Sequence, residues 1–169
     1  LVSRDIGAHG ATIFTAREGM DMHSNLKSDC NSLYPLVKAL IDANIKITAL
    51  RDATRGGVSA VLNEWAKQSN ICIEVEEENI PVSDEVKGIC EMLGFEATNL
   101  ANEGTFLLAI PKNDAARAIE VLHTFPESSN ACIIGKVTAQ YPQKVILNSS
   151  WGTKRFLDTP TGELLPRIC

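Results

Sequence analysis

The chain has 169 residues, of which 44% are hydrophobic and 22% are charged, and its formal net charge is -5. This length is typical of one domain with its own hydrophobic core, and the composition excludes a disordered chain. The basic residues are scattered and no apolar run is long enough to cross a bilayer, so we expect neither nucleic acid binding nor a membrane span.

The first half of the sequence predicts three helices and two strands. Ser32 is the expected N-cap of the second helix, and Gly56 and Gly57 open the third, which is amphipathic. Alternation of apolar and polar residues predicts the strands. The predicted helices cover residues 9–20, 32–41 and 56–70, and the predicted strands cover 45–50 and 71–75.

The second half alternates helices with strands and ends in a run of strands. Ser83 is the expected N-cap of a helix that Gly94 stops, and Pro126 ends a later helix. A mostly apolar stretch over 105–110 predicts a buried central strand. The helices cover 83–93 and 114–125, and the last strands cover 133–139, 145–147 and 154–157. This order predicts an α+β fold, a mixed sheet with packed helices, over residues 1–158.

The start of the chain and its cysteines bear on where the protein works. The chain opens with Leu1-Val2-Ser3-Arg4, without an initiator Met or a secretory signal, so we expect a fragment of a longer protein. Its five cysteines include no C-x-x-C pair, and His23 and His123 lack a partner at metal-ligand spacing. We therefore expect a cytoplasmic protein without a metal site.

Four of the cysteines have surroundings that indicate their exposure. Cys72 and Cys132 adjoin isoleucines and Cys90 lies within a predicted helix, so core packing is expected for all three. Cys30 lies in the polar stretch Asp29-Cys30-Asn31 and is expected to be an exposed loop thiol.

A glycine-containing segment, Arg51-Asp52-Ala53-Thr54-Arg55-Gly56-Gly57, connects a predicted strand to a helix. Backbone N–H groups at a helix start, together with Arg55, could hold a phosphate. A plain turn that needs glycine is the alternative, because the spacing matches neither the P-loop nor the dinucleotide fingerprint.

Asn102-Glu103-Gly104 lies immediately before the predicted strand over 105–110. A carboxylate at this position could project into a cleft and act as a base. The alternative is a solvated turn, since these are ordinary turn residues.

The last eleven residues, 159–169, are expected to form a mobile tail. Pro160, Gly162 and Pro166 keep this segment out of a helix or a central strand. The thiol of the final residue, Cys169, could move between sites as a carrier, or it could belong to an inert frayed end.

Taken together, these features resemble the C-terminal half of the HypE family of hydrogenase maturation proteins, in the aminoimidazole ribonucleotide synthetase superfamily. The resemblance runs from about Gly7 to Cys169, and the ending Pro166-Arg167-Ile168-Cys169 is its specific element. Other members of the superfamily share the domain without the terminal Cys. The family commonly has Gly-Asp-His-Gly where this chain has Gly7-Ala8-His9-Gly10, so one carboxylate is lost.

The resemblance implies an ATP-dependent carbamoyl dehydratase. A partner carbamoyltransferase, HypF, would place a carboxamide on Cys169, and phosphorylation of the amide oxygen would then leave a thiocyanate. The thiocyanate would supply cyanide to the iron of [NiFe]-hydrogenase through a HypC-HypD scaffold. The fold implied is a sheet with helices and a partial likeness to a ferredoxin-like arrangement.

The resemblance also implies the roles of particular residues. Cys169 and Glu103 would be catalytic, and His9 and Asn102 would line the site. An absent N-terminal domain would supply the Mg-ATP ligands and the homodimer interface, so the fragment alone would be inactive. A non-catalytic docking module, or another synthetase of the superfamily, remains the alternative. The residues implied in nucleotide binding are Arg51, Asp52, Thr54, Arg55, Gly56 and Gly57.

Overall fold

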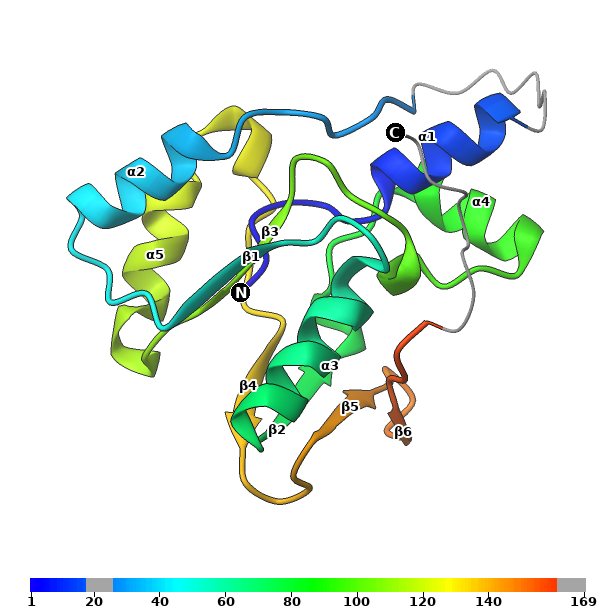
Figure 1. Ribbon diagram of the computed structural model, residues 1–169. Helices are drawn as coiled ribbons and strands as arrows, with labels where there is room; N and C mark the ends of the chain where they lie inside the picture. Colours follow the sequence, from blue (N-terminus) through cyan, green and yellow to red (C-terminus); the bar gives the residue numbers. More distant parts are fainter. Residues whose placement is uncertain (18–25, 161–169) are drawn as a thin grey trace.

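A computed structural model describes residues 1–17 and 26–160 of the chain (Figure 1). The helices are α1 (Ala8–Arg17), α2 (Tyr34–Asp42), α3 (Gly57–Ser69), α4 (Asp84–Leu93) and α5 (Ala115–Leu122). Four single-turn helices are η1 (Glu77–Asn79), η2 (Ala97–Asn99), η3 (Lys112–Asp114) and η4 (Pro126–Ser128). The strands are β1 (Ala49–Asp52), β2 (Cys72–Glu76), β3 (Phe106–Ala109), β4 (Gly135–Thr138), β5 (Lys144–Asn148) and β6 (Lys154–Phe156).

The strands form two sheets. β1 and β3 make an antiparallel pair in which Asp52 lies opposite Phe106, and Val2 bridges to β3 at Leu107. The other four strands lie in the order β4-β2-β5-β6. There β2 runs parallel to β5, while the other neighbours are antiparallel, so this sheet is mixed as expected. The α+β prediction is confirmed, with two sheets instead of one.

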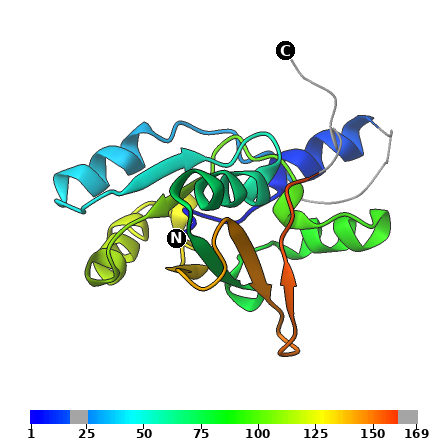
Figure 2. The same ribbon diagram turned by 60° about the horizontal axis from the view of Figure 1, so that its bottom comes forward.

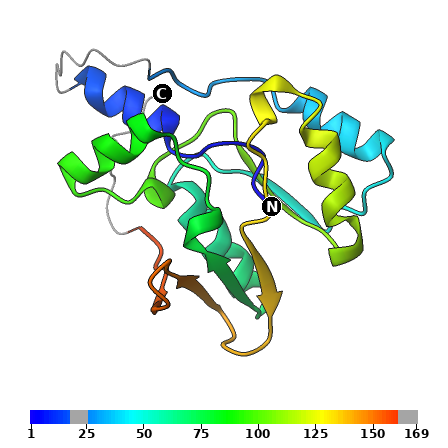
Figure 3. The same cartoon turned by 180° about the vertical axis from the view of Figure 1, so that it is seen from behind.

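Three apolar clusters hold the elements together. α3 packs on the four-stranded sheet through a cluster that includes Val58, Leu62 and Val145. α2 and α5 lie side by side at one end of the molecule and pack against the β1-β3 pair (Figure 2). α1 and α4 meet at the other end, as the view from behind also shows (Figure 3). The β1-β3 pair therefore lies between α3 and the helices α2 and α5.

Local signals place the ends of α4 and α3 correctly. The Ser83 hydroxyl accepts a hydrogen bond from the backbone N–H of Val86, and Gly94 ends α4 with a φ of +70°. α3 begins at Gly57 and its C-cap is Asn70, which has a φ of +52°. Both helices match the prediction.

The strand predicted over 45–50 is displaced, because β1 begins only at Ala49. Ile45 is buried and Ile47 is half-buried, and both pack on the cluster of α2 and α5 from an irregular segment. Their alternation thus reflects burial of a connection and not strand pairing. In the same region Ser32 does not cap α2, since Leu33 occupies the N-cap position without a side-chain bond. The helix begins at Tyr34, so its N-cap lies one residue later than predicted.

Candidate functional site

The two loops singled out in the sequence lie against each other. The backbone N–H of Ala53, which follows β1, donates to the carbonyl of Thr105 at 2.9 Å. The N–H of Asn102 donates in turn to the carbonyl of Ala53 at 3.1 Å. These bonds continue the β1-β3 pairing beyond the strand ends. They bring the segment 51–57 and the segment 102–104 to one place.

Asn102 connects these loops to the start of α1. Its side chain is fully buried, and its Oδ1 accepts from the N–H of Gly7 at 2.7 Å. Its Nδ2 donates to the carbonyls of Ala53 at 2.8 Å and Leu100 at 3.1 Å. The amide is thus bonded to backbone groups on three sides. Asn102 therefore stabilises the packing of the two loops against the start of α1.

The start of α3 lies in close contact with the backbone of η2 and the residue after it. Gly56 and Gly57 have φ values of +72° and +60°, which favour glycine. A Cβ on Gly57 would lie 2.5 Å from the carbonyl oxygens of Thr98 and Leu100. The N–H of Gly57 donates to the carbonyl of Thr54 at 3.0 Å. The first N–H of α3 is thus engaged within the turn, and Val58 and Ser59, which follow it, are buried.

The charged residues of this loop have different partners. Arg51 forms an ion pair with Glu64 of α3, and both side chains are about half exposed. Arg55 and Asp52 are exposed. Among the carboxylates in residues 1–17 and 26–160, none lies within ion-pair distance of Arg55. Arg55 therefore offers its charge at the helix start, whereas Arg51 is already engaged.

Asp29 joins the site although the sequence reasoning missed it. Its side chain is 3% exposed, and its Oδ1 accepts from the N–H of Glu103 at 3.0 Å. Its Oδ2 accepts from the N–H of Gly104 at 3.0 Å and from the hydroxyl of Thr105 at 2.8 Å. The Glu103 side chain itself is exposed. The sequence carries no local signal for Asp29, because its partners lie more than seventy positions later.

His9 reaches the same region from α1. Its Nδ1 lies 2.9 Å from the hydroxyl of Ser28, the residue before Asp29. The N–H of Gly10 donates to the carbonyl of Ala101 at 2.9 Å. The half-buried imidazole thus lies beside the segment that carries Asp29. His9 also follows Gly7, the residue whose N–H binds the Asn102 side chain, by two positions.

The chain leaves β6 toward the start of α3. The buried Asn63 donates from Nδ2 to the carbonyl of Leu157 at 2.8 Å, and Leu157 is itself buried. Pro160 then reaches Gly56, since a Cβ on that glycine would lie 3.8 Å from the Pro160 Cγ. Cys169 and the rest of 161–169, like His23 and the end of the first predicted helix, lie outside the described residues.

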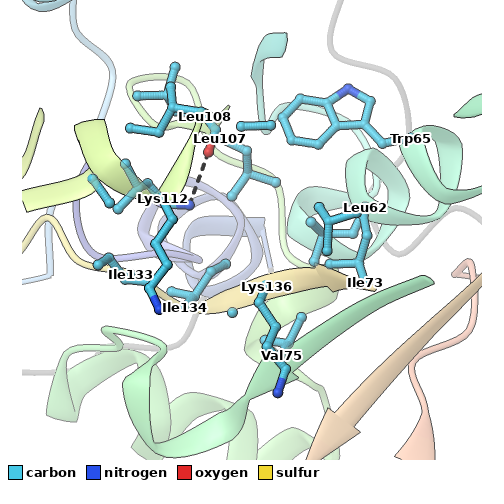
Figure 4. A pocket seen from close by; sticks show the side chains of 16 residues that line it. Leu62, Trp65, Ile73, Val75, Leu107, Leu108, Lys112, Ile133, Ile134 and Lys136 are labelled. Atoms are coloured by element: carbon cyan, nitrogen blue, oxygen red, sulfur yellow. Dashed lines mark hydrogen bonds between the residues drawn. The ribbon is translucent and has the colours of Figure 1, made fainter. Parts of the chain in front are cut away.

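A separate apolar cavity of about 590 Å³ lies between α3, β3 and β4 (Figure 4). Leu62 and Trp65 face Ile133 and Lys136 across it. Its walls contain no carboxylate and none of the predicted site residues. The chemistry predicted from the sequence therefore belongs to the loop cluster and not to this cavity.

Residues 1–17 and 26–160 contain no group of three or more His, Cys, Asp or Glu side chains arranged to hold a metal ion. None of the helices described here is both long enough and apolar enough to cross a membrane.

The fold and the loop cluster define a class. Residues 1–148 match the family model of the AIR synthase related protein, C-terminal domain, and the chain belongs to this family. Within it, the chain is 44% identical to the carbamoyl dehydratase HypE of Escherichia coli strain K12 over 169 residues. That alignment covers 100% of this chain and 49% of the relative, so the chain spans about half the length of the curated relatives it matches. The resemblance to HypE inferred from the sequence is confirmed.

Solved structures agree with this placement. A crystal structure of the hydrogenase maturation protein HypE in complex with ATP superposes with a TM-score of 0.93 at 35% identity. It covers 99% of this chain and 51% of that one. HypE in a HypE-HypF complex superposes with a TM-score of 0.89 at 36% identity, covering 94% of this chain and 52% of that one.

Proposed function

We propose that this chain is the C-terminal half of an ATP-dependent carbamoyl dehydratase that works in [NiFe]-hydrogenase maturation. The observation that carries the proposal is the convergence of the Glu103 loop, the start of α3 and the root of the tail at Pro160. Cys169 lies nine positions after Pro160, and an extended chain of that length spans at most about 30 Å. We propose that this length lets the Cys169 thiol reach both loops.

In the proposed reaction, Cys169 carries an S-carboxamide that loses the elements of water. The C–O bond breaks, both N–H protons leave the nitrogen, and the carbon-nitrogen bond becomes triple, which gives a thiocyanate. ATP supplies the phosphoryl group that makes the amide oxygen a leaving group. Glu103 accepts the first proton from the amide nitrogen, a role that its exposed carboxylate on a fixed backbone suits. The departing phosphate carries away the amide oxygen and the second proton, and ADP is the other product.

The described residues fit one part of a nucleotide. The N-terminal end of the α3 dipole and the exposed guanidinium of Arg55 offer a phosphate positive charge, and Arg55 also offers hydrogen-bond donors. Thr54 contributes its carbonyl to the turn, and Asp52 lies at the loop entrance as an exposed carboxylate. Mg²⁺ prefers several oxygen ligands, and the described residues contain no such group. We assign the Mg²⁺ ligands to the missing half.

The same proposal covers partners and location. HypE in a solved complex binds HypF, and we propose a HypF-type carbamoyltransferase as the source of the carboxamide. A HypC-HypD scaffold would receive the cyanide, and the missing half would form a homodimer. We also propose that the protein works in the cytoplasm.

Mass spectrometry of the C-terminal peptide tests the proposal in the full-length protein with HypF, a carbamoyl donor and ATP. The wild type should first gain a carboxamide on Cys169 and then lose 18 mass units as the thiocyanate forms. Glu103→Gln keeps the shape but removes the base, so carbamoylation should persist while dehydration falls about 100-fold.

Glu120→Gln on α5, an exposed glutamate far from the loop cluster, is the matched control and should behave like the wild type. Cys169→Ala should carry no adduct and keep its melting temperature. An unmodified Cys169 in the wild type would instead support a partner-docking module or another synthetase activity.

A further inference from the structure

We infer that Asp29 is the positioning residue of the Glu103 loop, and that its buried carboxylate fixes the direction from which Glu103 meets the amide. This inference rests on the proposed function, since it assigns Asp29 to the reaction in which Glu103 is the base. Asp29 does not touch the reacting group. It acts through the backbone of the loop that carries Glu103.

Three donors meet on this one carboxylate. They are the N–H groups of Glu103 and Gly104 and the hydroxyl of Thr105, at 3.0, 3.0 and 2.8 Å. Both oxygens are used, so the carboxylate bonds two successive N–H groups at once. Hydrogen bonds to an ionised acceptor are about twice as strong as neutral ones, and burial strengthens them further. The backbone of Glu103 is thereby held to a single orientation.

The contact extends to the backbone of the Asp29 segment. The N–H of Asn31 donates to the carbonyl of Glu103 at 3.4 Å. A Cβ on Gly104 would lie 1.8 Å from the carbonyl oxygen of Asp29, so only glycine admits this approach. Arg4 donates from Nη1 to the same carbonyl oxygen at 3.5 Å. The backbone of Glu103 is therefore hydrogen-bonded through both its N–H and its carbonyl, while its side chain stays exposed.

This arrangement matters because a base must be held in one position relative to the group that it deprotonates. A displacement of about 1 Å in a reacting group can lower a rate about 100-fold. Asp29 supplies the rigidity from a segment more than seventy positions away. The carboxylate does more than fill space, since an apolar residue at this position would leave its three donors without an acceptor.

The test measures single-turnover dehydration of carbamoylated full-length protein for four variants: wild type, Asp29→Asn, Glu103→Gln and the double variant. Asn keeps the size but puts an NH₂ group against at least one of the three donors. We expect Asp29→Asn to lower the rate at least 10-fold with the KM for ATP unchanged. In the Glu103→Gln background it should lower the residual rate less than 2-fold, because it acts only through Glu103.

Asp42→Asn is the matched control, an exposed aspartate on α2 that should leave the rate unchanged. Equal losses in both backgrounds, or a raised KM for ATP with the rate retained, would overturn the inference. If Glu103→Gln alone were fully active, the proposed base would fail instead, whatever Asp29 does.

Thr105→Val supplies a second variant in case Asp29→Asn does not fold. It removes one of the three donors and keeps the side-chain volume. We expect a 3- to 10-fold lower rate in the wild-type background and no change beside Glu103→Gln. A wild-type rate for a folded Thr105→Val, together with full activity of a folded Asp29→Asn, would show that the hydrogen bonds to Asp29 have no role in the reaction.

Discussion

At the scale of single residues, buried polar groups organise this site while exposed ones are available for chemistry. Asn102 and Asp29 are buried, and their hydrogen bonds end on backbone groups and one hydroxyl. Glu103 and Arg55 are exposed on the loops that those bonds fix. Because unpaired buried polar groups are costly, each buried residue specifies one arrangement of its loop.

The four described cysteines should differ in reactivity. Cys30 is exposed, whereas burial, reinforced by the Glu91 charge, raises the pKa of Cys90. Burial also raises the pKa of Cys132. The thiolate is the reactive form, so a raised pKa leaves less of it at pH 8. Iodoacetamide labelling followed by peptide mass mapping should modify Cys30 first. Labelling of Cys90 should accelerate as the pH rises toward its pKa. Equal labelling rates for Cys30 and Cys90 at pH 8 would contradict this prediction.

Arg55 should contribute to nucleotide binding in the full-length protein. Replacing it by Gln removes a charge-assisted hydrogen bond, which is worth about 1.5–3 kcal/mol. We expect the KM for ATP to rise about 10-fold or more in a steady-state phosphate-release assay. Arg117→Gln, an exposed arginine on α5, is the control and should not change it. An unchanged KM for Arg55→Gln would mean that the segment 51–57 is only a turn.

At the scale of elements, the close approach of α3 to η2 depends on glycine at its first position. Gly57→Ala would place a Cβ 2.5 Å from two carbonyl oxygens at a φ of +60°. We expect a loss of about 2 kcal/mol or more in the free energy of unfolding, measured by urea denaturation. Gly88→Ala in α4 is the matched control, because nothing lies within 4 Å of its added Cβ. It should stabilise the protein by up to about 1 kcal/mol. Similar effects of the two variants would contradict the contact.

Element boundaries follow from the sequence where the signal is local. Ser83 and Gly94 act within one turn of α4, so their residue types suffice to place its ends. Ile45 misleads because its burial comes from α2 and α5, which the local alternation does not reveal. The Glu103 loop could be proposed as a site from its position before a strand. The hydrogen bonds from this loop to Asp29 could not be predicted, since that contact exists only after the chain has folded back on itself.

At the scale of the whole molecule, the chain holds one side of the proposed nucleotide site. A helix start contributes about 1 kcal/mol to anion binding, while association costs several kcal/mol. We therefore expect the 169-residue chain alone to bind Mg-ATP with a Kd of about 1 mM or weaker, and to be inactive. Isothermal titration calorimetry measures this directly. Micromolar binding would mean that this half contains a complete nucleotide site.

The position of Pro160 beside Gly56 also sets the effective concentration of the Cys169 thiol. Nine residues of chain confine the Cys169 thiol to a sphere of about 30 Å radius around the start of α3. One thiol in that volume corresponds to an effective concentration on the order of 10 mM. In the proposed reaction, a free peptide that carried the S-carboxamide would have to reach that concentration to compete. Covalent attachment would therefore let a weak docking contact suffice.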